Sequence, residues 1–139
     1  MTTLEAETKM VGPHEFRFIP PDRIWIAFCG DFDLPHAEPY LDFVHGCSEK
    51  CGGLLYAAYD LSCIGQITPS LRQRLVQVDR PYPCAAVALF GANISTRAVV
   101  TMVLAAARIL KPKHVAFPHK FVESIDEANA WFDELKSKR

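Results

Sequence analysis

Hydrophobic and polar positions in residues 53–70 predict a buried strand that leads into a helix. Residues 54–59 are uncharged and largely apolar behind a glycine pair, which is typical of a strand covered on both faces. The polar stretch 60–66 predicts a loop. Thr68 is a good N-cap and Pro69 suits the first helical position, so a helix should begin there. Ligands and partners usually bind where strands of an open α/β sheet pass into helices, so this stretch is the candidate site.

Strand and helix patterns alternate along the rest of the chain. Residues 15–19 and 24–28 flank a proline-containing turn and predict an antiparallel hairpin. The further predicted elements are a helix over 39–50, a helix from Thr68 that ends before Pro81, a strand over 84–90, a helix over 95–110, a strand over 114–117 and a final helix behind a Ser124–Glu127 capping box.

This order predicts a single α/β domain. The sheet should be mixed and mostly parallel, opened by the N-terminal antiparallel hairpin, with helices packed on it. The length of 139 residues suits one domain, and a hydrophobic content of 50% suffices for a continuous core. Residues 1–13 are expected to be a flexible N-terminal segment, and residues 14–139 the domain.

The charge balance favours neither nucleic acid nor a membrane as a partner. Lys and Arg number 15 against 16 Asp and Glu, which gives a net charge of -1. The N-terminal residues lack the apolar core of a signal peptide. The uncharged run 98–107 is far shorter than the roughly 20 residues that a membrane span needs. We expect a cytoplasmic protein without a transmembrane segment.

The five cysteines are expected to be reduced and to bind no metal. Their number is odd, and they lack the paired close spacing of a zinc ribbon. His45, Cys47 and Cys51 lie close together in sequence, but no second ligand pair follows at usable spacing. Buried cysteines are the simpler interpretation, and no cofactor is expected.

The predicted helix over 95–110 carries two stripes at helical spacing. The expected inner stripe is Val99, Met102, Val103, Ala106 and Leu110, and the outer stripe is Arg97, Thr101, Leu104 and Arg108. Apolar area flanked by arginine is typical of an interface core, so a second copy or a partner protein could cover the outer stripe. The alternative is an ordinary surface helix made soluble by its arginines.

Catalytic motifs are missing from the sequence. It contains no Gly-x-Ser-x-Gly, phosphate loop or His-Glu-x-x-His pattern. Asp31 and Asp33 form a close pair in a turn, where carboxylates more often cap backbone N–H groups than share a proton. Cys63 is the best candidate for a reactive thiol, because it lies near a predicted helix start. A buried loop cysteine is the competing interpretation.

Three stretches resemble a known family. They are similar to parts of STAS domains, the anti-sigma-factor-antagonist fold. Residues 25–34 resemble the strand and the following turn, with a glycine, an acidic residue, an apolar residue and an aspartate, that lead into the first helix of that family. The Asp-Leu-Ser segment in 59–64 resembles the end of the central strand, and residues 124–132 resemble the last helix. The resemblance implies a protein partner, an anti-sigma factor or a kinase-like regulator. In regulatory members a serine at the helix start after the central strand is phosphorylated; the matching position here is Pro69, which has no hydroxyl.

Thr68 and Ser70 flank Pro69 and could carry a phosphoryl group instead, because helix N-termini favour phosphate. The structural alternative is that Thr68 is only a cap and Ser70 only a first-turn residue.

We therefore expect a non-catalytic regulatory or protein-interaction domain. Its partner-binding residues would be Asp60, Ser62, Cys63, Gly65 and Gln66, together with Thr68 and Ser70. The first alternative is a small-ligand module with an apolar pocket between sheet and helices that binds a lipid or a nucleotide. The second is an enzyme that uses Cys63.

Overall fold

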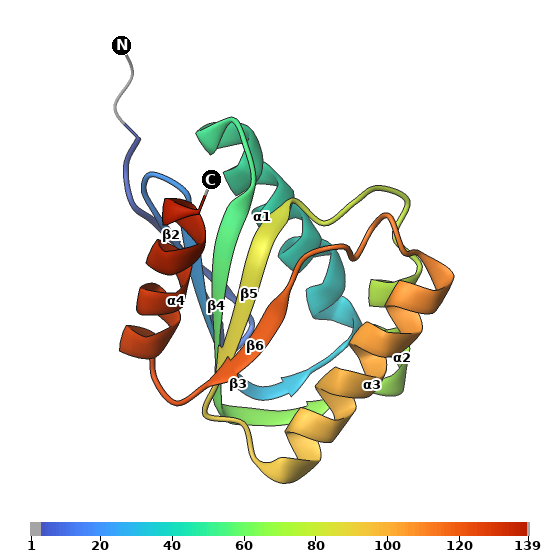
Figure 1. Cartoon of the computed structure of the whole chain (residues 1–139). Helices are drawn as coiled ribbons and strands as arrows, with labels where there is room; N and C mark the ends of the chain where they lie inside the picture. The colour runs from blue at the N-terminus through green and yellow to red at the C-terminus, as the bar shows by residue number, and fades with distance from the viewer. Residues whose placement is uncertain (1–3, 139) are drawn as a thin grey trace.

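The computed structural model describes residues 4–138 as one six-stranded sheet with helices on both faces (Figure 1). The elements, in chain order, are strands β1 (Glu7–Val11), β2 (His14–Ile19) and β3 (Arg23–Phe32), the short 3-10 helix η1 (Leu34–His36), helix α1 (Ala37–Cys51), strand β4 (Leu55–Ile67), helix α2 (Pro69–Val76), strand β5 (Cys84–Phe90), helix α3 (Ile94–Leu110), strand β6 (His119–Val122) and helix α4 (Ile125–Ser137).

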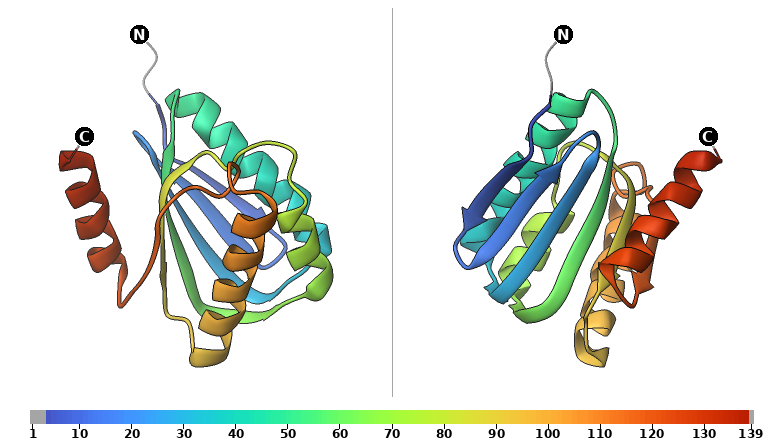
Figure 2. Two further views of the ribbon diagram at one scale, coloured as in Figure 1. Left: turned by 45° about the vertical axis from the view of Figure 1, so that its right-hand side comes forward. Right: turned by 90° about the vertical axis from the view of Figure 1, so that its left-hand side faces the viewer.

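The sheet is mixed and its strands lie in sequence order, β1 to β6. The pairs β1–β2 and β2–β3 are antiparallel, and the pairs from β3 to β6 are parallel. Helices α1, α2 and α3 cover one face, and α4 lies alone on the other (Figure 2). The predicted α/β class, the opening hairpin and the mostly parallel sheet are confirmed.

The helices begin where the sequence supplies side-chain caps. Thr68 starts α2 by accepting the Leu71 N–H, and Asn93 starts α3 by accepting the Thr96 N–H. Ser124 starts α4 by accepting the Glu127 N–H, while the Glu127 carboxylate accepts the N–H of Glu123. These bonds satisfy backbone donors that a helix start leaves without intrahelical partners, so the local sequence sets each start.

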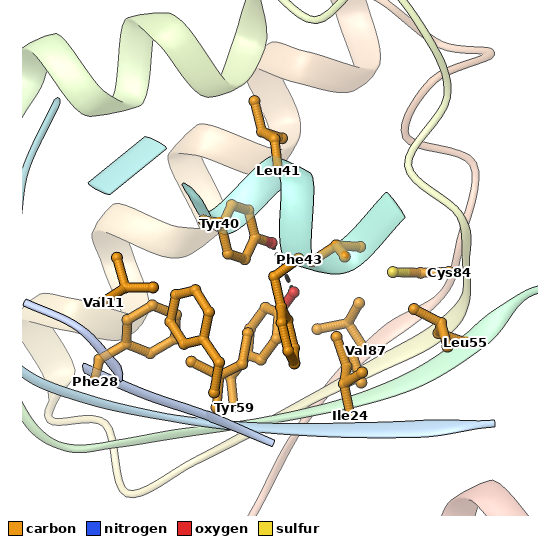
Figure 3. Packing of buried hydrophobic residues seen from close by; sticks show 14 of the residues in the cluster. Val11, Ile24, Phe28, Tyr40, Leu41, Phe43, Leu55, Tyr59, Cys84 and Val87 are labelled. Carbon is orange, nitrogen blue, oxygen red and sulfur yellow. Dashed lines mark hydrogen bonds between the residues drawn. The ribbon is translucent and has the colours of Figure 1, made fainter. Parts of the chain in front are cut away.

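The main core lies between the sheet and α1. Apolar side chains at alternate positions of β2 and β3, led by Phe16, Phe18 and Ile26, meet the inner face of α1. The hydroxyls of Tyr40 and Tyr59 lie 2.6 Å apart in this core and share a hydrogen bond (Figure 3). Burial raises the pKa of both phenols, so both stay neutral.

A second cluster holds α4 against the opposite face. Phe132 and Ala128 are buried on Tyr56 and on a group of small residues of β4 and β5: Ala58, Ala86 and Ala88. The alanines let the helix approach the sheet closely. Arg23 of β3 also holds α4 in place. Its guanidinium donates a hydrogen bond to Asn129 Oδ1 at 2.9 Å and forms an ion pair with Asp133 at 2.5 Å.

Two predicted strand boundaries were wrong. Residues 7–11, expected within a flexible segment, form β1 and pair with β2; residues 1–3 of that segment lie outside the described part. The expected loop over 60–66 is the second half of β4, which pairs with β3 through Cys29–Cys63, Gly30–Ile64 and Phe32–Ile67. Val11 and Leu61 reach the main core, but most of the other residues in these two stretches are exposed, so neither has the continuous apolar run that marks a buried strand.

The last strand lies later than predicted. Residues 114–117 form turns, and β6 begins at His119. Val115 is buried and Phe117 half-buried, so their apolar character reflects packing of a connecting segment against the core. A short apolar run cannot by itself be told from a strand.

The two faces of α3 differ in part from those predicted, although Val103 lies inside and Thr101 outside as expected. Leu104 lines an apolar cavity under the helix, whereas Met102 and Leu110, expected inside, are 60% and 65% exposed. Arg97 and Arg108 reach inward: Arg97 lies over the Phe121 ring, and Arg108 donates to a connecting segment. On the inner side of the helix the apolar stem and the charged end of each arginine both find contacts. The expectation that charged side chains face solvent therefore fails for these two residues.

Phe132→Ala is expected to lower the free energy of unfolding by about 3–5 kcal/mol, because it removes the aromatic side chain that anchors α4. Urea unfolding followed by circular dichroism measures this change. Glu134→Ala, an exposed change on the same helix, should shift stability by less than about 0.5 kcal/mol. Equal small effects would contradict the role of Phe132 as the anchor.

Candidate functional site

The candidate site is an exposed edge at the carboxyl ends of β3 and β4, which we call the rim. It consists of residues 29–33, residues 60–66 and the start of α2 at residues 68–70. The structure brings together the sequence-predicted residues Asp60, Ser62, Cys63, Gly65, Gln66, Thr68 and Ser70 along this edge. Ser62, Gly65, Gln66 and Ser70 are exposed.

Asp31 joins the two strand ends of the rim. Its Oδ1 accepts the backbone N–H of Gln66 at 2.8 Å. A Cβ atom at Gly65 would collide with Oδ1 of Asp31 and would also lie tightly against the backbone, 3.0 Å from the carbonyl carbon of Gly30 and 3.1 Å from the nitrogen of Asp31. Gly65 is therefore needed for the backbone of β4 to reach Asp31.

Asp33 connects η1 to the start of α2. Its Oδ1 accepts the Thr68 hydroxyl at 2.8 Å and the Leu34 N–H at 2.8 Å. These two hydrogen bonds, the one from Thr68 first, hold the pKa of Asp33 below its ordinary value. The Thr68 oxygen in turn accepts the Leu71 N–H at 3.4 Å, so Thr68 is a cap whose proton is already donated.

Asp60 and Ser62 form the third part of the rim. The Asp60 carboxylate accepts both the backbone N–H of Ser62 at 3.0 Å and its hydroxyl at 2.6 Å. Gly91, with φ of 79°, lies beside them; a Cβ there would be 2.9 Å from the Ser62 nitrogen. Asp31, Asp33 and Asp60 thus each bind backbone or hydroxyl donors, as the sequence suggested for the first two.

A disulfide joins Cys29 to Cys63 across β3 and β4, with their Cα atoms 4.6 Å apart. The expectation that all five cysteines are reduced was wrong for this pair, because register places the two side by side on neighbouring strands. With its sulfur bonded, Cys63 offers no thiol for nucleophilic attack. Cys47 and Cys84 are free and buried, and burial raises the pKa of each thiol to about 12.

His14 supports the rim from inside, and the sequence reasoning missed it. Its Nδ1 accepts the Cys29 N–H at 3.0 Å and its Nε2 donates to the Asp31 carbonyl at 3.1 Å, so a neutral ring serves both bonds. Burial is the main cause that lowers the pKa of His14; nearby His36 also lowers it, and the Asp31 carbonyl opposes this. The only sequence signal was a polar residue at an inward position of an alternating strand.

A cleft of about 300 Å³ lies next to the rim, between the starts of α2 and α3. Gly65, Gln66 and Ile67 form one wall, Arg72 of α2 another, and the third wall consists of Ser95, Thr96 and Val99 of α3. The Nε atom of Arg72 is buried and has no hydrogen-bond partner within residues 4–138. A buried donor without a partner is costly, and the positive charge of Arg72 makes this cleft suited to an acceptor group.

A separate apolar cavity of about 120 Å³ lies between the sheet and α3. Its walls include Phe28, Tyr59 and Leu89 from the sheet side and Val100 and Leu104 from α3. Only Ala107 of the 17 residues of α3 is fully buried, so the helix covers the sheet without filling the space beneath it.

The predicted outer stripe of α3 is not a surface cluster. Leu104 faces the cavity, Arg97 packs on Phe121, and Arg108 donates to the Phe117 carbonyl at 3.0 Å. Only Thr101 of the four is exposed. The interface hypothesis for Arg97, Thr101, Leu104 and Arg108 is therefore corrected, because three of these side chains are engaged within the fold.

Metal and membrane features were searched in the described part of the chain. No three His, Cys, Asp or Glu side chains of residues 4–138 are placed to hold a metal ion together. None of the helices in this part is both long and apolar enough to cross a membrane.

The sheet order and the helices on its two faces define an α/β domain with the SpoIIAA-like fold, which is the fold of STAS domains and anti-sigma-factor antagonists. One solved structure with this fold is that of an uncharacterized protein of the DUF3478 family from Shewanella loihica PV-4. The match has a TM-score of 0.56 and 11% identity, and it covers 94% of this chain and 97% of that chain. At this identity the likeness shows the fold alone.

No protein-family model matches the sequence, and the comparison with curated proteins gives no match. The fold predicted from the resemblance to STAS domains is confirmed by the structural likeness.

The stability of the protein should fall as the pH drops below 6.5, because the unfolded chain then binds a proton at His14 that the folded chain excludes. His45 and His119, whose pKa values are also lowered by burial, act in the same direction. Urea unfolding between pH 7.5 and 5 measures the slope. His14→Gln should be less stable at pH 7.5 and show a shallower slope; a curve parallel to that of the natural protein would contradict this role.

Proposed function

We propose that this protein is a non-catalytic, STAS-like interaction domain that binds a partner protein through the rim and the cleft beside it. The fold supports the class of protein. The rim is exposed, yet side-chain hydrogen bonds from Asp31, Asp33 and Asp60 hold its backbone in place. A surface ordered before binding loses little conformational entropy on association, which favours recognition.

The observation that carries this proposal is Arg72, whose buried Nε has no hydrogen-bond partner among residues 4–138. The same residue lines the cleft that opens beside Gly65 and Gln66 of the rim. A carboxylate from a partner protein would accept a charge-assisted hydrogen bond there. The hydroxyls of Ser95 and Thr96 line the same cleft and can donate to it as well. We therefore assign an acidic side chain of the partner to this cleft.

Control by phosphorylation belongs to the same proposal, and Ser70 is the residue better placed for it. Ser70 is exposed in the first turn of α2, whereas the Thr68 hydroxyl is bound to Asp33. A phosphoryl group on Ser70 would bring negative charge close to Asp33 and to the cleft, where it would compete with an acidic partner. Phosphorylation would then release the partner.

Arg72→Gln should reduce partner capture roughly tenfold or more, because it removes the charge that pairs with the partner's carboxylate. Crosslinked capture from native lysate, quantified by mass spectrometry, compares this variant with the natural protein. Ala130→Glu, on the exposed side of α4, serves as the matched surface control and should capture normally. Equal capture by all three proteins would refute the assignment of the cleft.

A second candidate function, a small-ligand module, is favoured by the apolar cavity under α3. Natural cores contain few spaces larger than a water molecule, and cavities of this size lined by apolar side chains can hold a small apolar molecule. Here about 120 Å³ is enclosed by apolar and aromatic side chains. The ligand would be apolar, such as part of a lipid, because most of the wall offers no polar contact.

Val100→Phe should fill the cavity and exclude such a ligand. Native mass spectrometry of the purified natural protein would show a retained small molecule, and the variant would show the bare mass. Ala130→Phe places the same ring on the exposed side of α4 and should leave the retained molecule in place. A bare mass for the natural protein, with no shift in melting temperature on adding fatty acids, would count against the ligand hypothesis.

A further inference from the structure

The apolar cavity under α3 has a small polar region in its wall. Among the described residues that line it, only Tyr40, Tyr59 and Tyr82 carry an oxygen or nitrogen atom in the side chain, and none carries a charge. The Tyr82 hydroxyl donates to the Leu75 carbonyl at 2.8 Å, so its proton is already used. The hydroxyls of Tyr40 and Tyr59 are therefore the donors that remain for a molecule in this cavity.

The Tyr40–Tyr59 pair has one proton more than its hydrogen bond needs. Each phenol carries one O–H, and the 2.6 Å bond between the two oxygens uses the proton of one of them. The proton of the other phenol has no acceptor within residues 4–138. The two side chains are only 7% and 9% exposed, so bulk water does not serve this donor. Leaving it unpaired costs free energy that an incoming acceptor would recover.

Aromatic packing holds both phenols in position. The Tyr59 ring meets Phe28 edge to face with ring centres 5.6 Å apart, and the Tyr40 ring meets Phe32 in the same way, also at 5.6 Å. Both phenylalanines line the cavity as well. Figure 3 shows Tyr40 of α1 and Tyr59 of β4 with their hydroxyls pointing toward each other. Donors fixed in this way lose little conformational entropy when they bind a ligand.

The size and chemistry of the cavity restrict the molecule that it can hold. An engineered apolar cavity of roughly 150 Å³ binds benzene, and this one measures about 120 Å³. A carboxylate would have to bury its charge against a wall that offers no cation, which is costly. A single water at the hydroxyls would leave most of the apolar wall without contacts, whereas a ring-sized molecule with one neutral oxygen would also contact the wall.

We propose that the cavity binds a small neutral molecule with one carbonyl oxygen, such as a cyclic ketone, and that this oxygen accepts the spare proton of the Tyr40–Tyr59 pair. This inference rests on the small-ligand function proposed above and adds the class of ligand. A ketone suits the pair because its oxygen accepts a hydrogen bond and carries no charge. A hydrocarbon of the same shape would fill the cavity but leave the proton unpaired.

Cyclohexanone and methylenecyclohexane test the proposal, because they have nearly the same shape and only the ketone carries an oxygen acceptor. NMR titration of the full chain, followed by the methyl groups of valine and leucine, gives both dissociation constants. Combining Tyr40→Phe with Tyr59→Phe removes both hydroxyls and keeps both rings. The double variant should lower the affinity for the ketone relative to the hydrocarbon roughly fivefold, since one neutral hydrogen bond is lost.

Tyr82→Phe is the matched control. Its hydroxyl lines the same cavity but donates to the Leu75 carbonyl, so the ratio of the two affinities should stay as in the natural protein. A measurement on the natural protein needs no variant. Cyclohexanone should move one phenolic proton resonance downfield, because that proton gains an acceptor, and methylenecyclohexane should not.

The outcomes separate this inference from the function on which it rests. If both probes bind, but the affinity ratio is the same in the double variant and the phenolic proton responds equally to both, the ketone assignment is overturned and the ligand function stands. If neither probe binds the natural protein, the cavity admits no small molecule, and the ligand function falls together with the inference.

Discussion

The pairing of β4 with its two neighbours is the constraint on which the rest of this structure depends. Leu55, Ala57 and Tyr59 face the α1 side of the sheet, and Tyr56 and Ala58 face α4. Because successive side chains of a strand point to opposite faces, this one strand belongs to both hydrophobic clusters. Its parallel partners β3 and β5 extend each cluster to either side. Both helical layers therefore pack against this strand.

The same strand carries the candidate site because it does not stop where the core stops. Beyond Asp60 it stays paired with β3, held by Asp31 and by the imidazole of His14, while Leu61, Ile64 and Ile67 line the cavity under α3. Most of the side chains there reach solvent, while the backbone keeps the order of a sheet. The candidate site therefore lies on an ordered continuation of the scaffold, although binding sites more often lie on flexible loops.

The sequence predicted the features that local chemistry determines. Thr68 with Pro69, and Ser124 with Glu127, identify helix starts because capping depends on neighbouring residues alone. The orientation of α3 could not be predicted in this way, because nearly every side of that helix is apolar and its arginines bind inside the fold. The pairing of Cys29 with Cys63 and the contacts of His14 depend on strand register, which links residues far apart in sequence. The Arg72 cleft likewise exists only once α2 and α3 are packed.

Two glycines near the candidate site are exposed to solvent but do not tolerate substitution. Gly65 and Gly91 are exposed, yet a single added carbon would collide with Asp31 at the first position and with Ser62 at the second. Gly91 also holds a left-handed conformation that other residues adopt only under strain. An engineer who redesigns this surface by choosing accessible positions would therefore disrupt it at these two places, whereas the exposed side chain of Gln66 can be exchanged more freely.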